Sequence, residues 1–416
     1  MTERDLDAIM RRMHGARMGR RKFLAGSAMA GTSAFLAACG AGGSSAAPPS
    51  AAASTAASAA PPASMDPGAS PSTGAAPAPS YATEGGLYMY NWAEYIDPGN
   101  IEEFKKRYNI TDWSYDVYDS NEVLLTKLQG GGTGLYDIGA PTAEYVKQMA
   151  DEGYIVELPF DRIPNAALVN PTFQNFFDPA GPDAKYNNYH LPKDWGTTGI
   201  AIRKKFVTED VKTWKDFFDI APKYSGKIVL VNSQGDVLTA PLKALGYSLN
   251  SVDPAELEQA RELLMGLAPH VLTLDSNDYG DRLATGEAVM GLVWTGGVVD
   301  LRDDPETADI EYIVPEDGTL YWMDTWVQFA DAPHPEAGLA FLNFIHEPDI
   351  QATETMTNRY ATPNDAAKEL VDPAVLEDPT IFVPDEAFGS LEGAQNVSSD
   401  PGRAALWEDF SASIGG

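Results

Sequence analysis

Aromatic rings, carboxylates or both occur in six short stretches, each at the end of an expected strand or in the loop beside it. Ligands of open α/β sheets bind just beyond the carboxyl ends of the strands, so residues at these positions are expected to converge on one cleft. Taken singly, a Trp more often packs in a core, and a carboxylate more often faces solvent. Their joint placement indicates a ligand site lined by Trp92, Glu94, Tyr95, Thr142, Glu144, Asp236, Trp294, Trp322, Asp324 and Tyr360.

The chemistry of such a site favours a small organic cation. The face of a Trp or Tyr ring attracts a desolvated ammonium group by roughly 0.5–2 kcal/mol. A carboxylate that accepts a hydrogen bond from an ammonium group adds roughly 1.5–3 kcal/mol. Two or three such pairs with two rings reach the roughly −8 kcal/mol of micromolar binding, after the costs of association are subtracted. A linear di- or polyamine fits a set of rings with carboxylates at separated positions.

Residue patterns typical of enzymes are scarce. The five histidines are scattered, no HExxH sequence is present, and no serine lies in a GxSxG sequence. The glycine-rich GGGTG at residues 130–134 is not followed by Lys-Ser or Lys-Thr, so we interpret it as a helix end and a turn. We predict no catalytic residue, no metal site and no cofactor. A secreted hydrolase that uses Glu94 and Asp324 is the alternative from another class, because carboxylate pairs also cleave glycosides.

Residues 1–39 have the pattern of an export signal. Arg20 and Arg21 precede a short apolar run that ends in Leu-Ala-Ala-Cys at Cys39. The run is too short and too rich in Ala and Gly to span a membrane. The segment resembles a twin-arginine signal that ends in a lipobox, which implies cleavage before Cys39 and attachment of a lipid to its sulfur. Cys39 is the only cysteine, so no intramolecular disulfide can form.

Residues 40–83 consist almost entirely of Ala, Ser, Pro and Gly. Such a segment cannot bury enough apolar surface to offset its conformational entropy, so we predict a disordered tether. Of the 29 basic and 60 acidic residues, seven and three lie in residues 1–39, so the remainder carries a net charge of about −35. A surface this acidic repels nucleic acid and attracts cations.

The remaining 330 or so residues exceed what one core usually supports, so two lobes are expected. Strand and helix patterns alternate at short spacing, which predicts a mostly parallel α/β sheet. Two extended stretches, 194–205 and 321–331, are predicted to cross between the lobes and form a hinge. The predicted N-terminal lobe comprises residues 84–197 and 323–368. The predicted C-terminal lobe comprises residues 198–322 and 369–416.

Motifs along almost the whole folded part resemble the substrate-binding lipoproteins of ABC-type spermidine/putrescine uptake systems. They are LYMYNWAEYID, the SNE before LLTKLQ, YDIGAPTAEYV, KYSGKIVLVN to LKALGYS, GEAVMGLVWTG, YWMDTWVQF, YATPN and AQNV. The order of NWxEY, WMD and TPN is specific to that family. The resemblance implies the two-lobed periplasmic binding protein fold of type II, with a ligand cleft between lobes joined by crossing strands.

The resemblance also implies roles for individual residues. Aromatic residues would stack on the ligand chain, acids would pair with its amines, and polar groups would contact its ends. These positions are Trp92, Tyr95, Trp294 and Trp322; Asp236 and Asp324; and Thr142, Tyr360 and Gln395. The sequence departs from the family pattern at Ala93, usually a hydroxyl residue, at Glu144, commonly an aromatic, and at Ser233, commonly a second acid. Glu144 and Ser233 therefore complete the predicted ligand-binding set.

Together these observations predict a solute-binding lipoprotein outside the cytoplasm that captures a putrescine- or spermidine-like cation for uptake. Its expected partners are the amine, an ABC-type permease in the membrane, and the bilayer that holds the lipid on Cys39. We expect a monomer that binds no nucleic acid. The alternative is a binding protein for another small solute on the same fold, such as an amino acid, an opine or a sugar. A ferric-ion receptor is disfavoured because it commonly uses adjacent tyrosines, which are absent.

Overall fold

The computed structural model describes residues 79–414. The predicted export signal with Cys39, and most of the predicted tether, lie outside these residues. Two residues near the end of that tether already contact the folded part. The Tyr81 hydroxyl donates to the carbonyl oxygen of Arg162 at 2.6 Å, and the Thr83 hydroxyl donates to that of Tyr108 at 3.0 Å.

The folded part alternates strands with helices, as the sequence pattern predicts. The strands are β1 Gly86–Asn91, β2 Asp112–Val117, β3 Ile138–Gly139, β4 Leu191–Arg203, β5 Ile228–Leu230, β6 Val271–Leu274, β7 Met290–Trp294, β8 Ile310–Ile313, β9 Thr319–Gln328 and β10 Leu391–Gly393. The longer helices are α3 Pro98–Tyr108, α4 Asn121–Gln129, α5 Val146–Asp151, α7 Trp214–Ile220, α8 Gln234–Ala244, α9 Pro254–Leu267, α10 Tyr279–Thr285, α12 Pro335–Ile345, α13 Pro348–Asn358 and α17 Pro401–Ser413. Short α-helical turns are α6 Pro171–Gln174, α11 Gly296–Val299, α14 Asp365–Lys368, α15 Pro373–Leu376 and α16 Asp385–Phe388.

Local sequence explains where the first helix begins. Asp97 caps α3 by accepting from the backbone N–H groups of Gly99 and Asn100, and Pro98 occupies the first helical position, where no intrahelical donor is needed. Lys105, Lys106 and Arg107 follow in the last turn, where the helix dipole favours positive charge. The chain therefore turns sharply from β1 into α3, and the intervening loop carries Trp92 and Tyr95.

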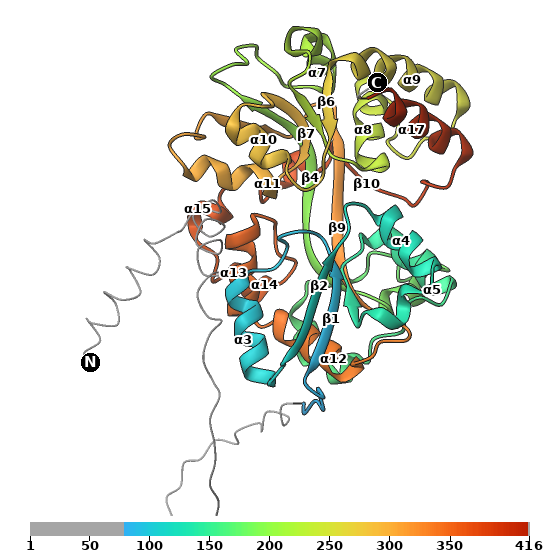
Figure 1. Ribbon diagram of the computed structural model, residues 1–416, viewed down its shortest axis with the longest axis vertical. Coiled ribbons are helices and arrows are strands. Elements are labelled where there is room, and N and C mark those ends of the chain that lie inside the picture. The colour runs from blue at the N-terminus through green and yellow to red at the C-terminus, as the bar shows by residue number, and fades with distance from the viewer. Residues whose placement is uncertain (1–78, 415–416) are drawn as a thin grey trace, which may run out of the picture. The chain divides into compact units, whose positions relative to one another are not determined.

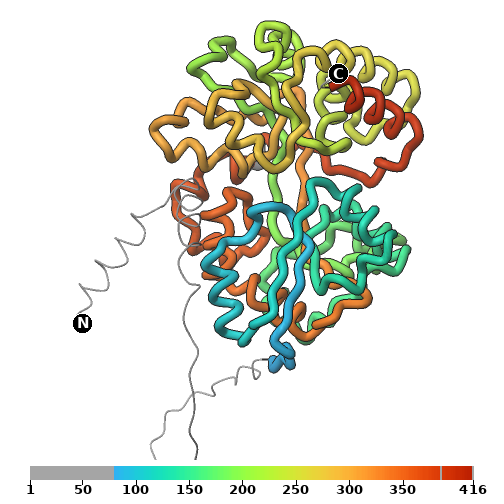
Figure 2. The backbone as a smooth tube through the Cα atoms, viewed as in Figure 1, coloured from blue at the N-terminus to red at the C-terminus, as the bar shows by residue number. Residues whose placement is uncertain are grey.

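Two long strands join the lobes, as predicted for residues 194–205 and 321–331. β4 and β9 run side by side from one lobe to the other (Figure 1), and they pair antiparallel from Leu191–Trp326 to Thr197–Tyr321. Beyond this stretch β4 pairs with β7 and β8 in the second lobe. All thirteen residues of β4 are buried. The backbone trace shows the same two segments linking the two halves (Figure 2).

The sheet is mixed rather than mostly parallel. Its main order is β2-β1-β3-β9-β4-β7-β5-β6, with β10 on β9 and β8 on β4. β1, β2 and β3 pair parallel, as do β5, β6 and β7, which fits the predicted α/β pattern. The central strands β9 and β4 pair antiparallel with β3, with each other and with β7, because both cross between the lobes. The prediction of a mostly parallel sheet is wrong for these strands.

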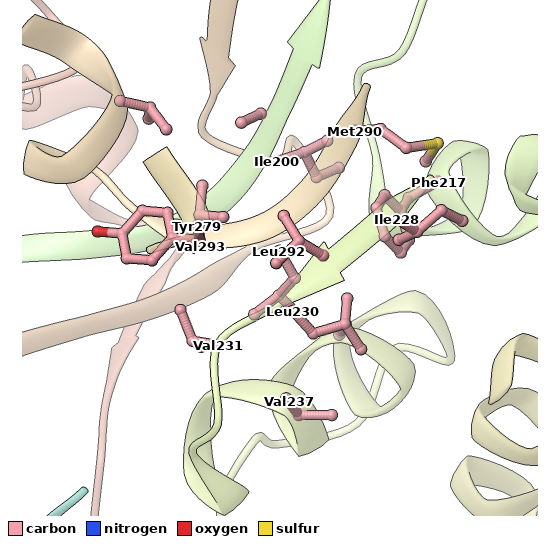
Figure 3. Packing of buried hydrophobic residues seen from close by; sticks show 14 of the residues in the cluster. Ile200, Phe217, Ile228, Leu230, Val231, Val237, Tyr279, Met290, Leu292 and Val293 are labelled. Carbon is pink, nitrogen blue, oxygen red and sulfur yellow. The ribbon is translucent and has the colours of Figure 1, made fainter. Parts of the chain in front are cut away.

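Each lobe has its own hydrophobic core. In the C-terminal lobe, β5 and β7 pack against the surrounding helices through side chains such as Ile228, Leu230 and Leu292, each at most 1% exposed (Figure 3). In the N-terminal lobe, Leu87 and Met89 of β1 lie on a core that includes Phe104 and Phe341. Within the described residues, no helix has the length and hydrophobicity to cross a bilayer. The exact lobe boundaries remain a prediction.

Candidate functional site

The five predicted aromatic residues lie in one cluster. Tyr95, Trp322 and Tyr360 are buried together, and Trp92 and Trp294 pack against them. The ring centroids are 4.9 Å apart for Trp322 and Tyr360 and 5.7 Å for Tyr95 and Tyr360. Trp92 and Trp294 approach to 5.6 Å, edge to face, although Trp92 follows β1 in one lobe and Trp294 ends β7 in the other. The cluster therefore lies where the two lobes meet.

Backbone features hold these rings in place. The indole nitrogen of Trp92 donates to the carbonyl oxygen of Ala140 at 2.8 Å. Gly196 of β4 allows the close approach of Trp322, since a Cβ at this position would lie 2.6 Å from its ring. A Cβ at Gly296 would likewise lie 2.5 Å from the ring of Tyr360. Both glycines therefore make room for the rings that line the cluster.

Asp324 lies at the centre of the polar part of the site. It is buried in β9, and its backbone forms an isolated β-bridge with Thr142. The hydroxyl oxygen of Tyr95 lies 2.7 Å from Asp324 Oδ2. Burial raises the pKa of Asp324 to about 7, and repulsion by Asp194 adds to this, while hydrogen bonds from Tyr95 and Thr142 and the charge of Lys193 act in the opposite direction. Because this pKa is close to neutral pH, the groups that surround Asp324 determine whether its carboxyl group is charged at pH 7.

The sequence-based reasoning missed Lys193 and Asp194, which form a buried ion pair beside Asp324. Lys193 Nζ lies 2.5 Å from Asp194 Oδ2 and 3.4 Å from the centroid of the Tyr95 ring. Asp194 Oδ1 lies 2.5 Å from the hydroxyl oxygen of the same Tyr95. Adjacent strand residues normally point to opposite faces, but the pairing of β4 with β9 shifts register between Pro192 and Asp194. This irregularity re-aims the side chains and permits the contact.

Asp236 is the second predicted acid, on the opposite lobe. It lies in the first turn of α8, and its carboxylate accepts hydrogen bonds from three side chains: Ser233 at 2.5 Å, Trp294 Nε1 at 3.0 Å, and Thr198. Burial nevertheless raises its pKa above the ordinary value for an aspartate. The hydrogen bond from Ser233 to Asp236 therefore links two of the predicted site residues.

Glu144 adds a third carboxyl group to the same region. It lies in the one-turn helix η2, Ala143–Tyr145, directly after Thr142. Its side chain keeps some solvent contact, yet desolvation by the surrounding protein raises its pKa well above the ordinary value. Repulsion from Asp324 and Asp236 raises it further. Asp324 and Asp236 are therefore close enough to Glu144 to oppose its ionisation.

The remaining predicted residues differ in placement. Thr142 is buried and exchanges two hydrogen bonds with Asn121, which the sequence-based reasoning did not select. Gln395 has an exposed side chain, and its backbone N–H donates to Asn250 Oδ1 at 2.8 Å. The structure thus brings together ten of the eleven predicted ligand-binding residues and leaves the side chain of Gln395 at the surface. Among residues 79–414, no group of three or more His, Cys, Asp or Glu side chains is arranged to hold a metal ion.

Two lobes joined by crossing strands, with a cluster of rings and carboxylates contributed by both, define the class of two-lobed solute-binding proteins. The predicted type II fold is confirmed. Residues 100–383 match the sequence model of the bacterial extracellular solute-binding proteins. The chain belongs to this family, whose members are transport proteins that bind a solute.

Proteins similar to this chain include polyamine-binding proteins, which confirms the resemblance seen in the sequence. The spermidine/putrescine-binding periplasmic protein of Escherichia coli is 32% identical over 326 residues, which cover 78% of this chain and 90% of that protein. The putrescine-binding periplasmic protein SpuD of Pseudomonas aeruginosa is 30% identical, with coverage of 73% and 85%. The solved structure of the spermidine/putrescine ABC transporter substrate-binding protein PotD from Streptococcus pneumoniae has a TM-score of 0.64 at 27% identity, with coverage of 79% and 98%.

Proposed function

We propose that this protein captures a linear polyamine, such as putrescine or spermidine, outside the cytoplasm and delivers it to an ABC-type permease in the membrane. The observation that carries the proposal is the joint placement of five aromatic rings and three carboxyl groups at the meeting of the lobes. The names of the relatives support the same ligand class.

The charges of the site favour a cation over an anionic or neutral solute. Asp324 and Asp236 raise the cost of ionising Glu144, and an ammonium group among the three carboxyl groups offsets that repulsion. The carboxylate of an amino acid would add to the repulsion instead. Lys193 does not provide a free counterion for such a carboxylate, because it already pairs with Asp194 at 2.5 Å. The Trp and Tyr faces fit the methylene groups between the amines.

The ligand class is tested by isothermal titration of a soluble chain of residues 79–416. We expect one-to-one binding of putrescine or spermidine with a dissociation constant in the micromolar range or tighter, roughly −8 kcal/mol or better. Agmatine, γ-aminobutyrate and arginine serve as comparison ligands that also carry a cationic group but differ from putrescine in their other groups. Heat from γ-aminobutyrate or arginine alone would contradict the proposal, because both carry a carboxylate. Turnover in a panel of glycosides would instead support the hydrolase alternative.

We also propose that the mature protein is an extracytoplasmic lipoprotein with its lipid on Cys39, and that it acts as a monomer. The proposed lipid anchor rests on the twin-arginine and Leu-Ala-Ala-Cys sequence pattern and on the length of the Ala-, Ser- and Pro-rich segment that follows it. A lipid on the first mature residue would hold the binding lobes within reach of a permease, at the distance that the tether sets.

Replacing the proposed lipid-bearing residue tests the anchoring. In Cys39→Ser, we expect the protein to move from the membrane fraction to the soluble fraction, because the hydroxyl of serine cannot take the thioether-linked lipid. Fractionation and immunoblotting of cells that express the full chain provide the measurement. Ser45→Ala, six residues further on in the tether sequence, is the matched control and should leave the protein with the membrane. A membrane-bound Cys39→Ser protein would contradict the anchor.

A further inference from the structure

A single hydroxyl group joins two buried carboxyl groups in the site. The oxygen of the Tyr95 hydroxyl lies 2.5 Å from Asp194 Oδ1 and 2.7 Å from Asp324 Oδ2. A phenol carries one hydrogen, so it can donate to only one of these acceptors. The other contact is also within hydrogen-bond distance and needs a proton between its oxygens, since two lone pairs that face each other repel. One of the two carboxyl groups must therefore hold a proton in this arrangement.

The ion pair with Lys193 decides which carboxyl group is protonated. The Lys193 ammonium group contacts Asp194 Oδ2 at 2.5 Å and lies over the Tyr95 ring, so it stabilises Asp194 as a carboxylate. Asp324 has no ammonium group in such direct contact among the described residues. Its raised pKa, about 7, agrees with this assignment. Burial and the two carboxylates also raise the pKa of Tyr95 well above 10, so the phenol itself keeps its hydrogen.

The other titratable groups around Asp324 are Glu144 from η2, Asp194 from β4, and the phenols of Tyr95, Tyr118 and Tyr360 from three loops. Repulsion by Asp194 raises the pKa of Asp324, whereas the hydrogen bond from Tyr95 lowers it. Asp236 from α8 acts on this set through Glu144. The positive charge of Lys193 lowers the pKa of Asp324. The same charge is ion-paired with Asp194 and also lowers the pKa of the buried Glu354 of α13. An incoming ammonium group is therefore the charge that can ionise Asp324.

We propose that capture of an amine releases the proton shared by Asp194, Tyr95 and Asp324, and that the Lys193–Asp194 pair is the positioning unit that holds this proton on Asp324. The proposal rests on the proposed amine ligand. When the ammonium group docks, the O–H bond of the Asp324 carboxyl group breaks and the proton leaves to the buffer. The ammonium N–H then donates to the Asp324 carboxylate. Tyr95 continues to donate to one of the two carboxylates.

The sign of the pH dependence follows from this exchange. The free protein binds the proton below about pH 7, and the amine complex does not, so affinity rises with pH up to about 7 and is constant above it. Below that value, the affinity changes about tenfold per pH unit. With a pKa of about 7, Asp324 contributes about 0.9 released protons per ligand at pH 6, about 0.5 at pH 7 and about 0.1 at pH 8.

Proton release is measured by titrating residues 79–416 with putrescine and with spermidine at pH 6, 7 and 8, in buffers of different ionisation enthalpy. For whichever amine binds, the wild-type protein should release protons with the pH dependence calculated for Asp324. Asp194→Asn removes the repulsion that adds to the effect of burial on the pKa of Asp324, so release at pH 6 and 7 should fall below the wild-type values. Lys193→Met/Asp194→Asn removes the pair without changing net charge, which guards against a folding defect from an unpaired lysine. It should show a smaller loss in the same direction, because Lys193, which lowers the pKa of Asp324, is removed together with Asp194.

Two results would overturn the proposal: amine binding to wild type without proton release at pH 6, or unchanged release in both variants. If no amine binds, the proposed function fails. Carboxyl carbon NMR of the ligand-free protein then tests by itself whether Asp194, Tyr95 and Asp324 share a proton. The Asp324 signal, assigned by its loss in Asp324→Asn, should titrate near pH 7 and should shift to lower pH in Asp194→Asn. Titration of Asp324 near 4, the ordinary value for aspartate, would contradict the shared proton.

Discussion

Asp324→Asn is expected to weaken putrescine or spermidine binding by roughly 10- to 150-fold. The estimate corresponds to the roughly 1.5–3 kcal/mol of a hydrogen bond between charged groups. Asparagine keeps the size and one acceptor oxygen of the buried aspartate but loses its charge, so the ammonium group loses its ionic partner at the centre of the site. Isothermal titration at pH 8 is the suitable measurement, because wild-type Asp324 is ionised there even without ligand.

A matched control separates the local effect from the loss of one negative charge. Asp210→Asn makes the same chemical change in a side chain that is 80% exposed, and we expect less than a twofold change in affinity. Both variants should keep the melting temperature of wild type within a few degrees. Within residues 79–414, Asp324 has no ammonium group in direct contact to leave unpaired, and the exposed ion pair of Asp210 with Lys212 contributes little to stability. Equal affinities for Asp324→Asn and wild type would remove Asp324 from the proposed site.

The sequence predicted those parts of the fold that depend on local rules. Asp97 and Pro98 begin α3 through capping and a fixed backbone angle, and both act within a few residues. The crossing strands were also predicted as extended stretches, and they appear as β4 and β9. Their antiparallel pairing was not predicted, because alternation of strands and helices along the chain does not determine which strands become neighbours.

In the candidate site, too, some residues could be predicted from local sequence and others could not. The rings and acids at strand ends were predictable because the carboxyl ends of strands gather at one edge of each lobe. Lys193 and Asp194 were not, since adjacent residues of a regular strand point to opposite faces and only the irregular pairing with β9 brings them together. Gln395 was chosen from the resemblance alone, and its side chain is exposed. Its role remains a prediction.

Trp294→Ala is expected to weaken amine binding by roughly 10- to 100-fold, in the range of a desolvated cation–π contact plus one hydrogen bond. The Trp294 ring lies 5.6 Å from that of Trp92 and forms the C-terminal lobe's side of the aromatic cluster. Its indole nitrogen also donates to Asp236 Oδ1 at 3.0 Å. Removing the indole therefore deletes a face for the ligand and leaves the buried Asp236 with one donor fewer.

Trp294→Phe and Trp407→Ala distinguish these two contributions from a general loss of packing. Phenylalanine keeps an aromatic face without the N–H, so this variant should recover part of the affinity, and the remaining deficit measures the hydrogen bond to Asp236. Trp407 of α17 is also partly buried on the core of the C-terminal lobe, so its removal should lower the melting temperature without a comparable loss of affinity. If Trp407→Ala weakened binding as much as Trp294→Ala, packing of the lobe rather than contact with the amine would explain both losses.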